Sequence, residues 1–406
     1  MSTPTGRSFP VEGSRSSTLA RCSSHPHDAR TVAETLIDEL LLEIISRVPA
    51  SERWRCKLVC NRWLRLTKAL PQSLAGFFYT SSCAKRLPEL ALHFFNVSGN
   101  LNVRRPIYLS LEFLADHRRI HLLDSRNGLL LCRLWGDPIQ DANKFICAVC
   151  NPARQECVRL PVRSQPAGKL VNAHLGFDPA VSSYFHVFLL LEDDVPCISG
   201  VDLYSSKTGR WVHKEKGWNQ DVCTTDVREE TVFLNGYLHF HAYVGAHDNG
   251  TVVQYLAAVA TDGETWTTIS VPTRPTYDDG FIQLSQGCLH YACFETNEDD
   301  ADDVKLAIYV LEDYESKRWK LKLRVQSADM FGGLVDVDDL DADFDWIAIH
   351  PECNVIFFTA GDPKQFMCYN MDLQKAKVMR TLSDGRSPYL PYVPLHRHIE
   401  LLSLRM

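Results

Sequence analysis

The sequence predicts a small all-α unit followed by an all-β propeller of about six blades. Three observations lead to this fold class. Apolar residues recur at helical spacing within residues 34–72. After about residue 100 the apolar period becomes two, and turn residues follow every 8–15 positions. Five segments of about 40–55 residues then repeat one order of strands and turns, which is typical of propeller blades.

Composition and charge narrow the classes of function. Of the 406 residues, 45% are hydrophobic and 23% charged, as in ordinary globular proteins. No apolar run approaches the 18 residues that a transmembrane helix requires. Residues 1–70 carry 11 Lys/Arg against 7 Asp/Glu, and the rest of the chain carries 32 against 43. Because nucleic-acid binding needs a basic surface, we expect no nucleic acid among the partners. Since no long apolar run is present, we expect no membrane partner either.

The N-terminal segment and the cysteines bear on the compartment. Residues 1–33 contain seven Ser and four Arg, with only Glu12 and Asp28 acidic. Organellar transit peptides share this composition, but it is more typical of a disordered tail, which we expect here. The 14 cysteines do not form the dense pattern of a short secreted scaffold. They are therefore predicted to be reduced, in the cytoplasm, the nucleus or both.

The helical unit is predicted over residues 34–72. One wide apolar stripe consists of Leu40, Leu41, Ile44, Ile45 and Val48. Asp38 is expected at the helix start, either in a capping box with Thr35 or as the cap itself, and Pro49 ends the helix. A second helical segment carries Trp54, Leu58, Val59 and Trp63. Since the apolar surface is large for so small a unit, we expect it to dock onto a partner.

The β region is predicted to be a linker over residues 73–100 and the propeller over 101–406. The five repeated units are 117–161, 170–214, 231–272, 281–325 and 345–382. Asn127-Gly128 and Asn235-Gly236 lie between apolar runs, which is a strong hairpin signal. The outer strands carry Trp211, Trp266 and Trp319. The apolar stretches 107–115 and 389–404 remain, and we expect them to complete a sixth blade from both chain ends.

Residues 36–66 resemble the F-box. The positions that match the family pattern are Leu36, Asp38, Glu39, Leu40, Leu41, Ile44, Arg47, Pro49, Arg55, Val59, Cys60 and Trp63. The body looks like the F-box-associated propeller of large plant F-box families. It carries NGLLL at 127–131, CNPARQECVRLP at 150–161 and LGFDPAVSSYFHV at 175–187. Together the two parts cover most of residues 36–402.

The resemblance implies the substrate-recognition subunit of an SCF-type ubiquitin ligase. In that family the F-box docks on a Skp-type adaptor, which bridges to cullin and RING subunits. The propeller, implied to be kelch-like, binds the protein to be ubiquitinated, whose identity is unknown. Neither a catalytic residue nor a cofactor or metal is implied for this chain. The adaptor-binding positions carried over are Leu36, Ile37, Leu40, Leu41, Ile44, Pro49, Val59 and Trp63.

This chain departs from the family pattern at three positions. Ile37 stands where the family usually has Pro, which loses a preset φ angle but keeps apolar surface. Ala50 and Arg53 replace residues that are usually more apolar. Each of the latter changes is expected to weaken adaptor binding by about 1 kcal/mol or more if the position is buried in the complex.

Other patterns are interpreted as structural. Cys147 and Cys150 form one CxxC on a predicted strand, where the two side chains face opposite ways. His239 and His241 share one strand face but have no third ligand nearby, so they are predicted to be packed blade residues. The acidic run 336–345 lacks the Gly and the terminal Glu of a calcium loop. The basic residues between 53 and 68 are interpreted as a solvated or adaptor-facing surface.

Two alternative functions remain open. Propellers also host enzymes with a site in the central funnel, which would require acids, histidines or a metal gathered near the axis. A scaffold that binds the adaptor without promoting degradation would carry the same F-box. Only the half-lives of bound proteins separate that scaffold from a ligase receptor.

Overall fold

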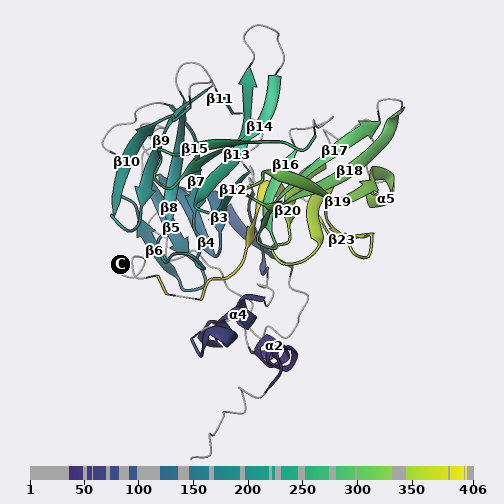
Figure 1. The fold of residues 1–406 in the computed structure, drawn as a ribbon, viewed down its shortest axis with the longest axis horizontal. Coiled ribbons are helices and arrows are strands. Elements are labelled where there is room, and N and C mark those ends of the chain that lie inside the picture. The colour runs from purple at the N-terminus through teal and green to yellow at the C-terminus, as the bar shows by residue number, and fades with distance from the viewer. Residues whose placement is uncertain are drawn as a thin grey trace, which may run out of the picture.

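The computed structural model shows a group of short helices and a ring of β-sheets (Figure 1). It describes residues 36–48, 53–56, 58–69, 74–81, 91–97, 119–135, 146–163, 169–192, 197–218, 222–224, 230–245, 252–273, 280–297, 300–331, 344–382, 385–396 and 398–399. Among these residues no helix has the length and apolar character needed to cross a membrane.

The helical unit consists of α2 (Asp38–Arg47), α3 (Arg53–Cys56) and α4 (Asn61–Ala69) in the part of the chain described. Its buried core is made of Leu41, Ile45, Cys56 and Leu66. The predicted cap is wrong, because α2 begins at Asp38 and its N-cap residue is Ile37, which makes no side-chain cap hydrogen bond. Thr35 lies outside the described residues. The Asp38 carboxylate instead accepts a hydrogen bond from Arg62 Nε of α4 at 2.7 Å, since a charged donor outcompetes the backbone amides.

Five blades contain a run of four antiparallel strands each. Blade 1 contains β3 (Arg119–Arg126), β4 (Leu129–Trp135), β5 (Ile146–Asn151) and β6 (Glu156–Arg159). Blade 2 contains β7 (Lys169–Gly176), β8 (His186–Glu192), β9 (Ile198–Ser205) and β10 (Arg210–Glu215). Blade 3 contains β12 (Thr231–Leu234), β13 (Tyr237–Gly245), β14 (Val252–Ala260) and β15 (Trp266–Ser270), plus the short β11 (Val222–Cys223) on β13.

The last two of these five blades follow the same order. Blade 4 contains β16 (Phe281–Ser285), β17 (Cys288–Asn297), β18 (Asp300–Asp313) and β19 (Arg318–Gln326). The helix α5 (Ser327–Phe331) follows it. Blade 5 contains β20 (Phe344–Ile349), β21 (Val355–Ala360), β22 (Gln365–Asn370) and β23 (Lys375–Thr381). The five predicted units coincide with blades 1 to 5, so the repeat is confirmed.

The sixth sheet closes the ring with strands from both ends of the β region. In the residues described it contains β2 (Ala91–Asn96), β1 (Gly76–Ser81) and β24 (Gly385–Tyr392), in that order. We call it the closing blade. The six-bladed propeller is therefore confirmed, as is the contribution of the C-terminal stretch, part of which lies in β24. Residues 73–100, expected to form a linker, instead contain β1 and β2, because the C-terminal strand needs hydrogen-bonding partners along its edges. The stretch 107–115 lies outside the described residues.

Tight turns set the register of the hairpins. Asn127 and Gly128 have φ angles of 47° and 88°, and Asn235 and Gly236 have 53° and 82°. Gln286 and Gly287 repeat the pattern with 51° and 76°. Two successive positive φ angles match the twist of the flanking strands, as the Asn-Gly signals predicted.

The C-terminal segment that contains Val393 and Leu395 passes close to the Asn127-Gly128 turn. Leu395 packs against the core cluster between blades 1 and 2, and Ile399 is buried in it. Asn151 Nδ2 donates a hydrogen bond to the Leu395 carbonyl at 3.0 Å. A Cβ on Gly128 would lie 2.4 Å from Leu395 Cβ and 2.7 Å from the Val393 oxygen. The segment therefore passes so close to the turn that only glycine fits.

Replacing Gly128 by alanine is expected to destabilise the propeller more than the same change at Gly236. Both glycines have positive φ, which costs alanine about 1–2 kcal/mol. Only Gly128 adds a steric conflict, because no atom lies within 4 Å of a Cβ at Gly236. Urea unfolding of the two variants measures the difference. Equal losses of unfolding free energy would contradict the tight packing of the C-terminal segment.

Tryptophans lie on the outer strands, as predicted, and two of the three connect neighbouring blades. Trp211 Nε1 of blade 2 donates to the Pro161 carbonyl after blade 1 at 2.7 Å. Trp319 Nε1 of blade 4 donates to the Ser270 carbonyl of blade 3 at 2.8 Å. Trp266 Nε1 bonds within its own hairpin, to the Gly263 carbonyl at 3.0 Å. Two of the three predicted tryptophans thus connect blades.

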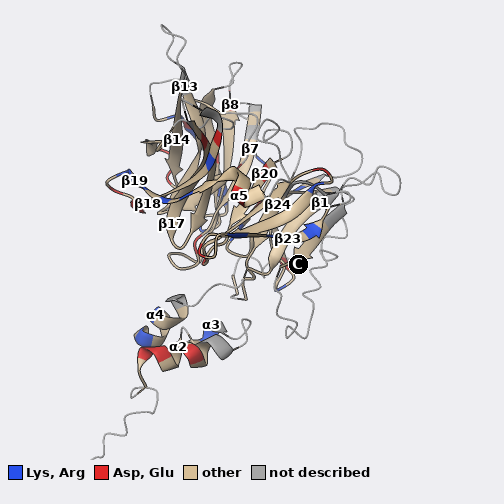
Figure 2. Cartoon of the chain, turned by 90° about the vertical axis from the view of Figure 1, so that its right-hand side faces the viewer, with Lys and Arg blue, Asp and Glu red and all other residues tan. Residues whose placement is uncertain are grey.

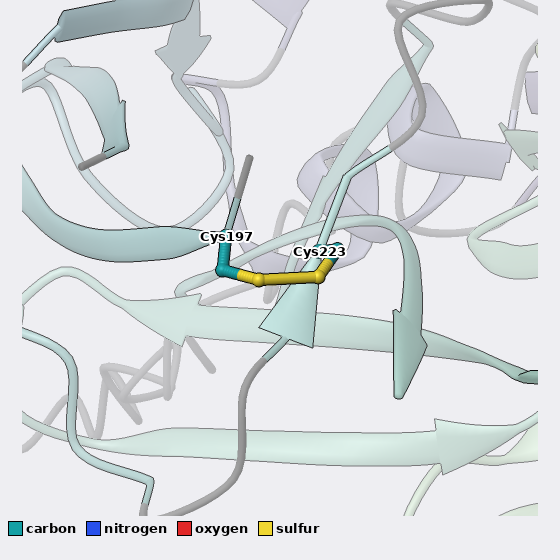
Figure 3. Close-up of a disulfide and its surroundings, with 2 residues drawn as sticks. All are labelled: Cys197 and Cys223. Atoms are coloured by element: carbon teal, nitrogen blue, oxygen red, sulfur yellow. A yellow bond between two sulfur atoms is a disulfide. The ribbon is translucent and has the colours of Figure 1, made fainter. Parts of the chain in front are cut away.

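The prediction that all cysteines are reduced is wrong for one pair. Cys197 and Cys223 form a disulfide between blades 2 and 3 (Figure 3). The other described cysteines carry thiols. Sequence spacing gave no sign of this pair, because its members are 26 residues apart, the other described cysteines are unpaired, and the two meet through the docking of β11.

Candidate adaptor-binding site

Apolar side chains of the helical unit lie exposed along α2 and in the turn between α3 and α4. Ile37, Leu40 and Ile44 are 60%, 50% and 46% exposed, and Leu58 and Val59, between α3 and α4, are 74% and 60% exposed. We call these five residues the apolar face. The spacing of three and four residues places Ile37, Leu40 and Ile44 along one side of α2. A group of such side chains in contact with water is typical of a protein-binding surface.

The core of the unit is filled by the other side of the same helix. Leu41 is 1% exposed and Ile45 is fully buried, both against Cys56 and Leu66. Neighbours in sequence point about 100° apart around a helix, so Leu41 can face the core while Leu40 points outward. The side chains of the apolar face are therefore not needed to fill the core of the helical unit.

The structure separates the eight predicted adaptor-binding residues into three groups. Four of them belong to the apolar face: Ile37, Leu40, Ile44 and Val59. Leu41 is buried in the core, and Leu36 and Trp63 are partly buried against it. Pro49 lies outside the described residues. Leu41 is consequently unavailable to a partner, although it matches the motif.

One residue of the apolar face was absent from the predicted set. Leu58 is 74% exposed, the highest value on this face. In the sequence Leu58 stands out only as part of the second helical pattern, because it is not among the positions that match the F-box. The sequence signal that could have identified Leu58 is an apolar residue directly beside Val59 in a turn.

An ion-pair cluster holds α2 against α4. The Asp38 carboxylate lies 2.7 Å from Arg62 and 3.0 Å from Arg65 (Figure 2 shows the charged residues). Arg62 also donates to the Leu36 carbonyl. The hydrogen bond from Arg62 is the main cause that holds the pKa of Asp38 below its ordinary value. Two residues of the basic cluster thus serve the internal packing that orients the apolar face.

A second polar cluster lies on the innermost strands of blades 1, 2 and 3. Asp124 Oδ2 accepts hydrogen bonds from the Leu175 amide at 2.9 Å and from Arg126 Nε at 3.2 Å. Arg126 Nη2 donates to Thr231 Oγ1 at 2.8 Å and to the Thr231 carbonyl. His174 Nδ1 lies 3.2 Å from Thr231 Oγ1. We call Asp124, Arg126, His174 and Thr231 the inner cluster.

The inner cluster is a structural tie between three blades. Asp124, His174 and Thr231 are buried, and the Arg126 side chain is 15% exposed. Burial lowers the pKa of His174 to about 4, so the imidazole is neutral at physiological pH. The hydrogen bonds of the inner cluster connect β3 to β7 and β12. Within the described residues, no group of three or more His, Cys, Asp or Glu is placed to hold a metal ion.

The remaining sequence candidates are packed residues. Cys147 faces the cluster between blades 1 and 2, whereas Cys150 faces the cluster toward the closing blade, so the two thiols point to opposite sides of β5. His239 Nδ1 donates to the Val232 carbonyl at 3.0 Å, and its Nε2 accepts from the Tyr314 hydroxyl at 2.7 Å. Residues 336–343 of the acidic run lie outside the described part of the chain.

Buried histidines make the propeller sensitive to acid. Burial lowers the pKa of His174, His186, His239 and His290 to about 4, against 6.5 in a free side chain. Below pH 6.5 the unfolded chain binds protons at these residues, whereas the folded chain does not until about pH 4. Their contribution is therefore complete above pH 6.5 and is lost as the pH falls toward 4. At pH 5 each fully buried histidine is expected to cost about 2 kcal/mol of unfolding free energy.

Urea unfolding at pH 7.5 and at pH 5 measures this effect. The urea concentration at the midpoint of unfolding is expected to be lower at pH 5 than at pH 7.5. This difference is expected to be smaller in a His239→Gln variant, because glutamine does not titrate. A midpoint that is the same at both pH values would contradict neutral buried histidines.

Comparisons with known proteins agree with this organisation. The family model described as "F-box domain" matches residues 34–71, and the model described as "F-box protein At3g26010-like, beta-propeller" matches residues 88–391. F-box protein At5g49610 of Arabidopsis thaliana is 24% identical over 307 residues, 70% of this chain and 77% of that protein. F-box protein At5g07610 of Arabidopsis thaliana is 28% identical over 197 residues, 43% of this chain and 44% of that protein.

One solved structure, from a study of two prolyl endopeptidases, aligns with a TM-score of 0.37 at 12% identity. It covers 76% of this chain and 40% of the other, a likeness too low to carry an argument. The kelch-like classification stays a prediction, since the propeller model that matches this chain is the At3g26010-like one. The F-box model and the propeller model together span most of the chain, and the chain therefore belongs to the family of F-box proteins whose F-box is followed by an At3g26010-like β-propeller.

Proposed function

We propose that this chain is the substrate-recognition subunit of an SCF-type ubiquitin ligase. F-box domains in general bind the Skp1 adaptor. The observation that carries the proposal is the apolar face, whose five side chains are 46–74% exposed although the core beneath is filled. Burying each of them against adaptor helices contributes about 1 kcal/mol or more.

The departure at Ile37 is compatible with docking. Ile37 is 60% exposed at the start of α2, so it offers apolar surface where the family usually has Pro. Ala50 lies outside the described residues, as does the side chain of Arg53. We propose adaptor contacts through Ile37, Leu40, Ile44, Leu58 and Val59.

The propeller is proposed to hold the protein that is ubiquitinated. Cullin and RING subunits would be reached through the adaptor, and the transfer of ubiquitin would occur on those subunits. This chain would then act without catalysis, in the cytoplasm or the nucleus. The inner cluster supports the non-catalytic role, because its acid and arginine are bonded to each other, and its arginine and histidine are both bonded to Thr231 of a neighbouring blade.

Proximity labelling of the full chain and of a full-length Leu40→Asp/Ile44→Asp variant tests the proposal. Both proteins keep the propeller, so both are expected to label the same substrates. Only the native chain should shorten the half-lives of those substrates. Unchanged half-lives with a retained adaptor would support a non-degradative scaffold instead, and loss of labelling in the variant would contradict substrate binding by the propeller.

A further inference from the structure

The disulfide between Cys197 and Cys223 joins two neighbouring blades. Cys197 directly precedes β9 of blade 2, and Cys223 ends β11 on blade 3 (Figure 3). The two residues also form an isolated antiparallel β-bridge, with their Cα atoms 3.9 Å apart. Backbone pairing therefore brings the two sulfur atoms together.

The placement of this pair differs from that of the cysteines buried in the core. Cys147 and Cys150 lie in apolar clusters, where burial raises the pKa of the Cys147 thiol to about 12 and that of Cys150 well above its usual range. Such thiols are poor nucleophiles. Cys223 is half-buried, and Cys197 is 9% exposed beside it. A small thiol or disulfide can therefore reach Cys223 more readily than the core cysteines.

The bond secures the middle of a long connection. Residues 216–230 join β10 to β12, and β11 is the strand in the described part of this connection. β11 pairs with β13 through Val222 with Val244 and Cys223 with Tyr243, and Cys223 also bridges to Cys197. Val222 is buried in the apolar cluster between blades 2 and 3. Two residue pairs, one bridge and one buried side chain are a weak attachment without the disulfide.

We propose that Cys197 and Cys223 form a reversible redox clip that fastens β11 to the rim of the propeller. The reversibility rests on the proposed function, since a ligase subunit in the cytoplasm or nucleus meets thiol buffers that reduce disulfides. Oxidation holds the connection between β10 and β12 against blades 2 and 3. Reduction releases β11 and changes the surface that the rim presents to a bound protein.

The oxidant is a small disulfide of the glutathione class. The Cys223 thiolate attacks one sulfur of that disulfide and releases one small thiolate. The Cys197 thiolate then attacks Cys223 Sγ in the mixed disulfide and releases the second small thiolate. Two cysteine thiols are oxidised, one small disulfide is reduced to two thiols, and the protons of the cysteines pass to the released thiolates. Reduction is the same sequence reversed.

Titration of the purified full chain in glutathione buffers of increasing oxidised fraction tests the clip. After alkylation of free thiols, peptide masses are expected to show one two-electron transition confined to Cys197 and Cys223. In Cys197→Ser, the remaining Cys223 should instead form a mixed disulfide with glutathione. The matched control Cys353→Ser, at another half-buried cysteine, should retain the transition.

Amide exchange of β13 tests what the clip holds. The amides of Tyr243 and Val244 point to opposite sides of β13, one toward β11 and one toward β14. Exchange of the amide that faces β11 is expected to rise about tenfold or more on reduction, and equally in Cys223→Ser under oxidising conditions, whereas the other amide should be unchanged. A pair that stays reduced in every buffer, or that stays bonded in every buffer, would overturn the clip. So would equal exchange in both redox states. None of these measurements involves the adaptor, so a failed clip leaves adaptor binding untouched.

Discussion

The double variant Leu40→Asp/Ile44→Asp is expected to lose binding to a Skp-type adaptor by about a hundredfold or more. Both side chains belong to the apolar face, at 50% and 46% exposure. Each substitution removes apolar area and places an unpaired charge in the contact, at a cost of about 2 kcal/mol or more. Since 1.4 kcal/mol is a factor of ten in affinity, the two together exceed a hundredfold. Titration of the purified chain with the adaptor measures the loss.

Two controls keep this result specific. Leu373→Asp makes the same change at a 67% exposed leucine in a turn of blade 5 and should leave adaptor affinity unchanged. The double variant should unfold at the same urea concentration as the native chain, because neither side chain fills the core of the helical unit. Full adaptor affinity in the double variant would refute the assigned face.

Leu58→Asp is expected to weaken adaptor binding as well, although Leu58 is not among the positions that match the F-box pattern.

Removing the Arg126 side chain is expected to be the most destabilising change in the propeller, at about 3–5 kcal/mol of unfolding free energy. Arg126→Ala leaves the Asp124 carboxylate, 7% exposed, as a buried charge without its cation. It also removes the hydrogen bonds to Thr231 that connect blades 1 and 3. Urea unfolding followed by tryptophan fluorescence measures the loss.

An exposed ion pair provides the matched comparison. Lys320 and Glu312 lie 3.1 Å apart with side chains 67% and 58% exposed, so Lys320→Ala should cost about 1 kcal/mol or less. Asp124→Asn combined with Arg126→Met should cost less than the sum of the two single changes, because the pair is removed together. An Arg126→Ala variant no less stable than Lys320→Ala would show that the inner cluster does not hold the blades.

The blades could be predicted because their signals are local. A strand with one buried face needs alternating apolar residues, and a two-residue hairpin needs positive φ at both positions. Asn127-Gly128 and Asn235-Gly236 satisfy that need within two residues of chain. The order of strands within each blade follows from such hairpins, so blades 1 to 5 could be located without any long-range information.

The ends of the β region could not be placed in the same way. β1 pairs Gly76 with Tyr392 of β24, more than three hundred residues later in the chain. Hydrophobic pattern alone does not say which distant strand will be the neighbour. Residues 76–96 therefore resembled a linker, although two of their segments form strands. The meeting of Cys197 and Cys223 depends on the same kind of long-range pairing.

The sequence by itself determined the two-part organisation, the blade repeat and the F-box resemblance, because each depends on residues close together in the chain. Only the tertiary structure decided that Leu40 and Ile44 face outward while Leu41 and Ile45 fill the core. It also decided that Arg126 reaches across blade 2 to Thr231. Burial and charge pairing depend on what packs against a side chain, and that neighbour is set by the whole fold rather than by the local pattern.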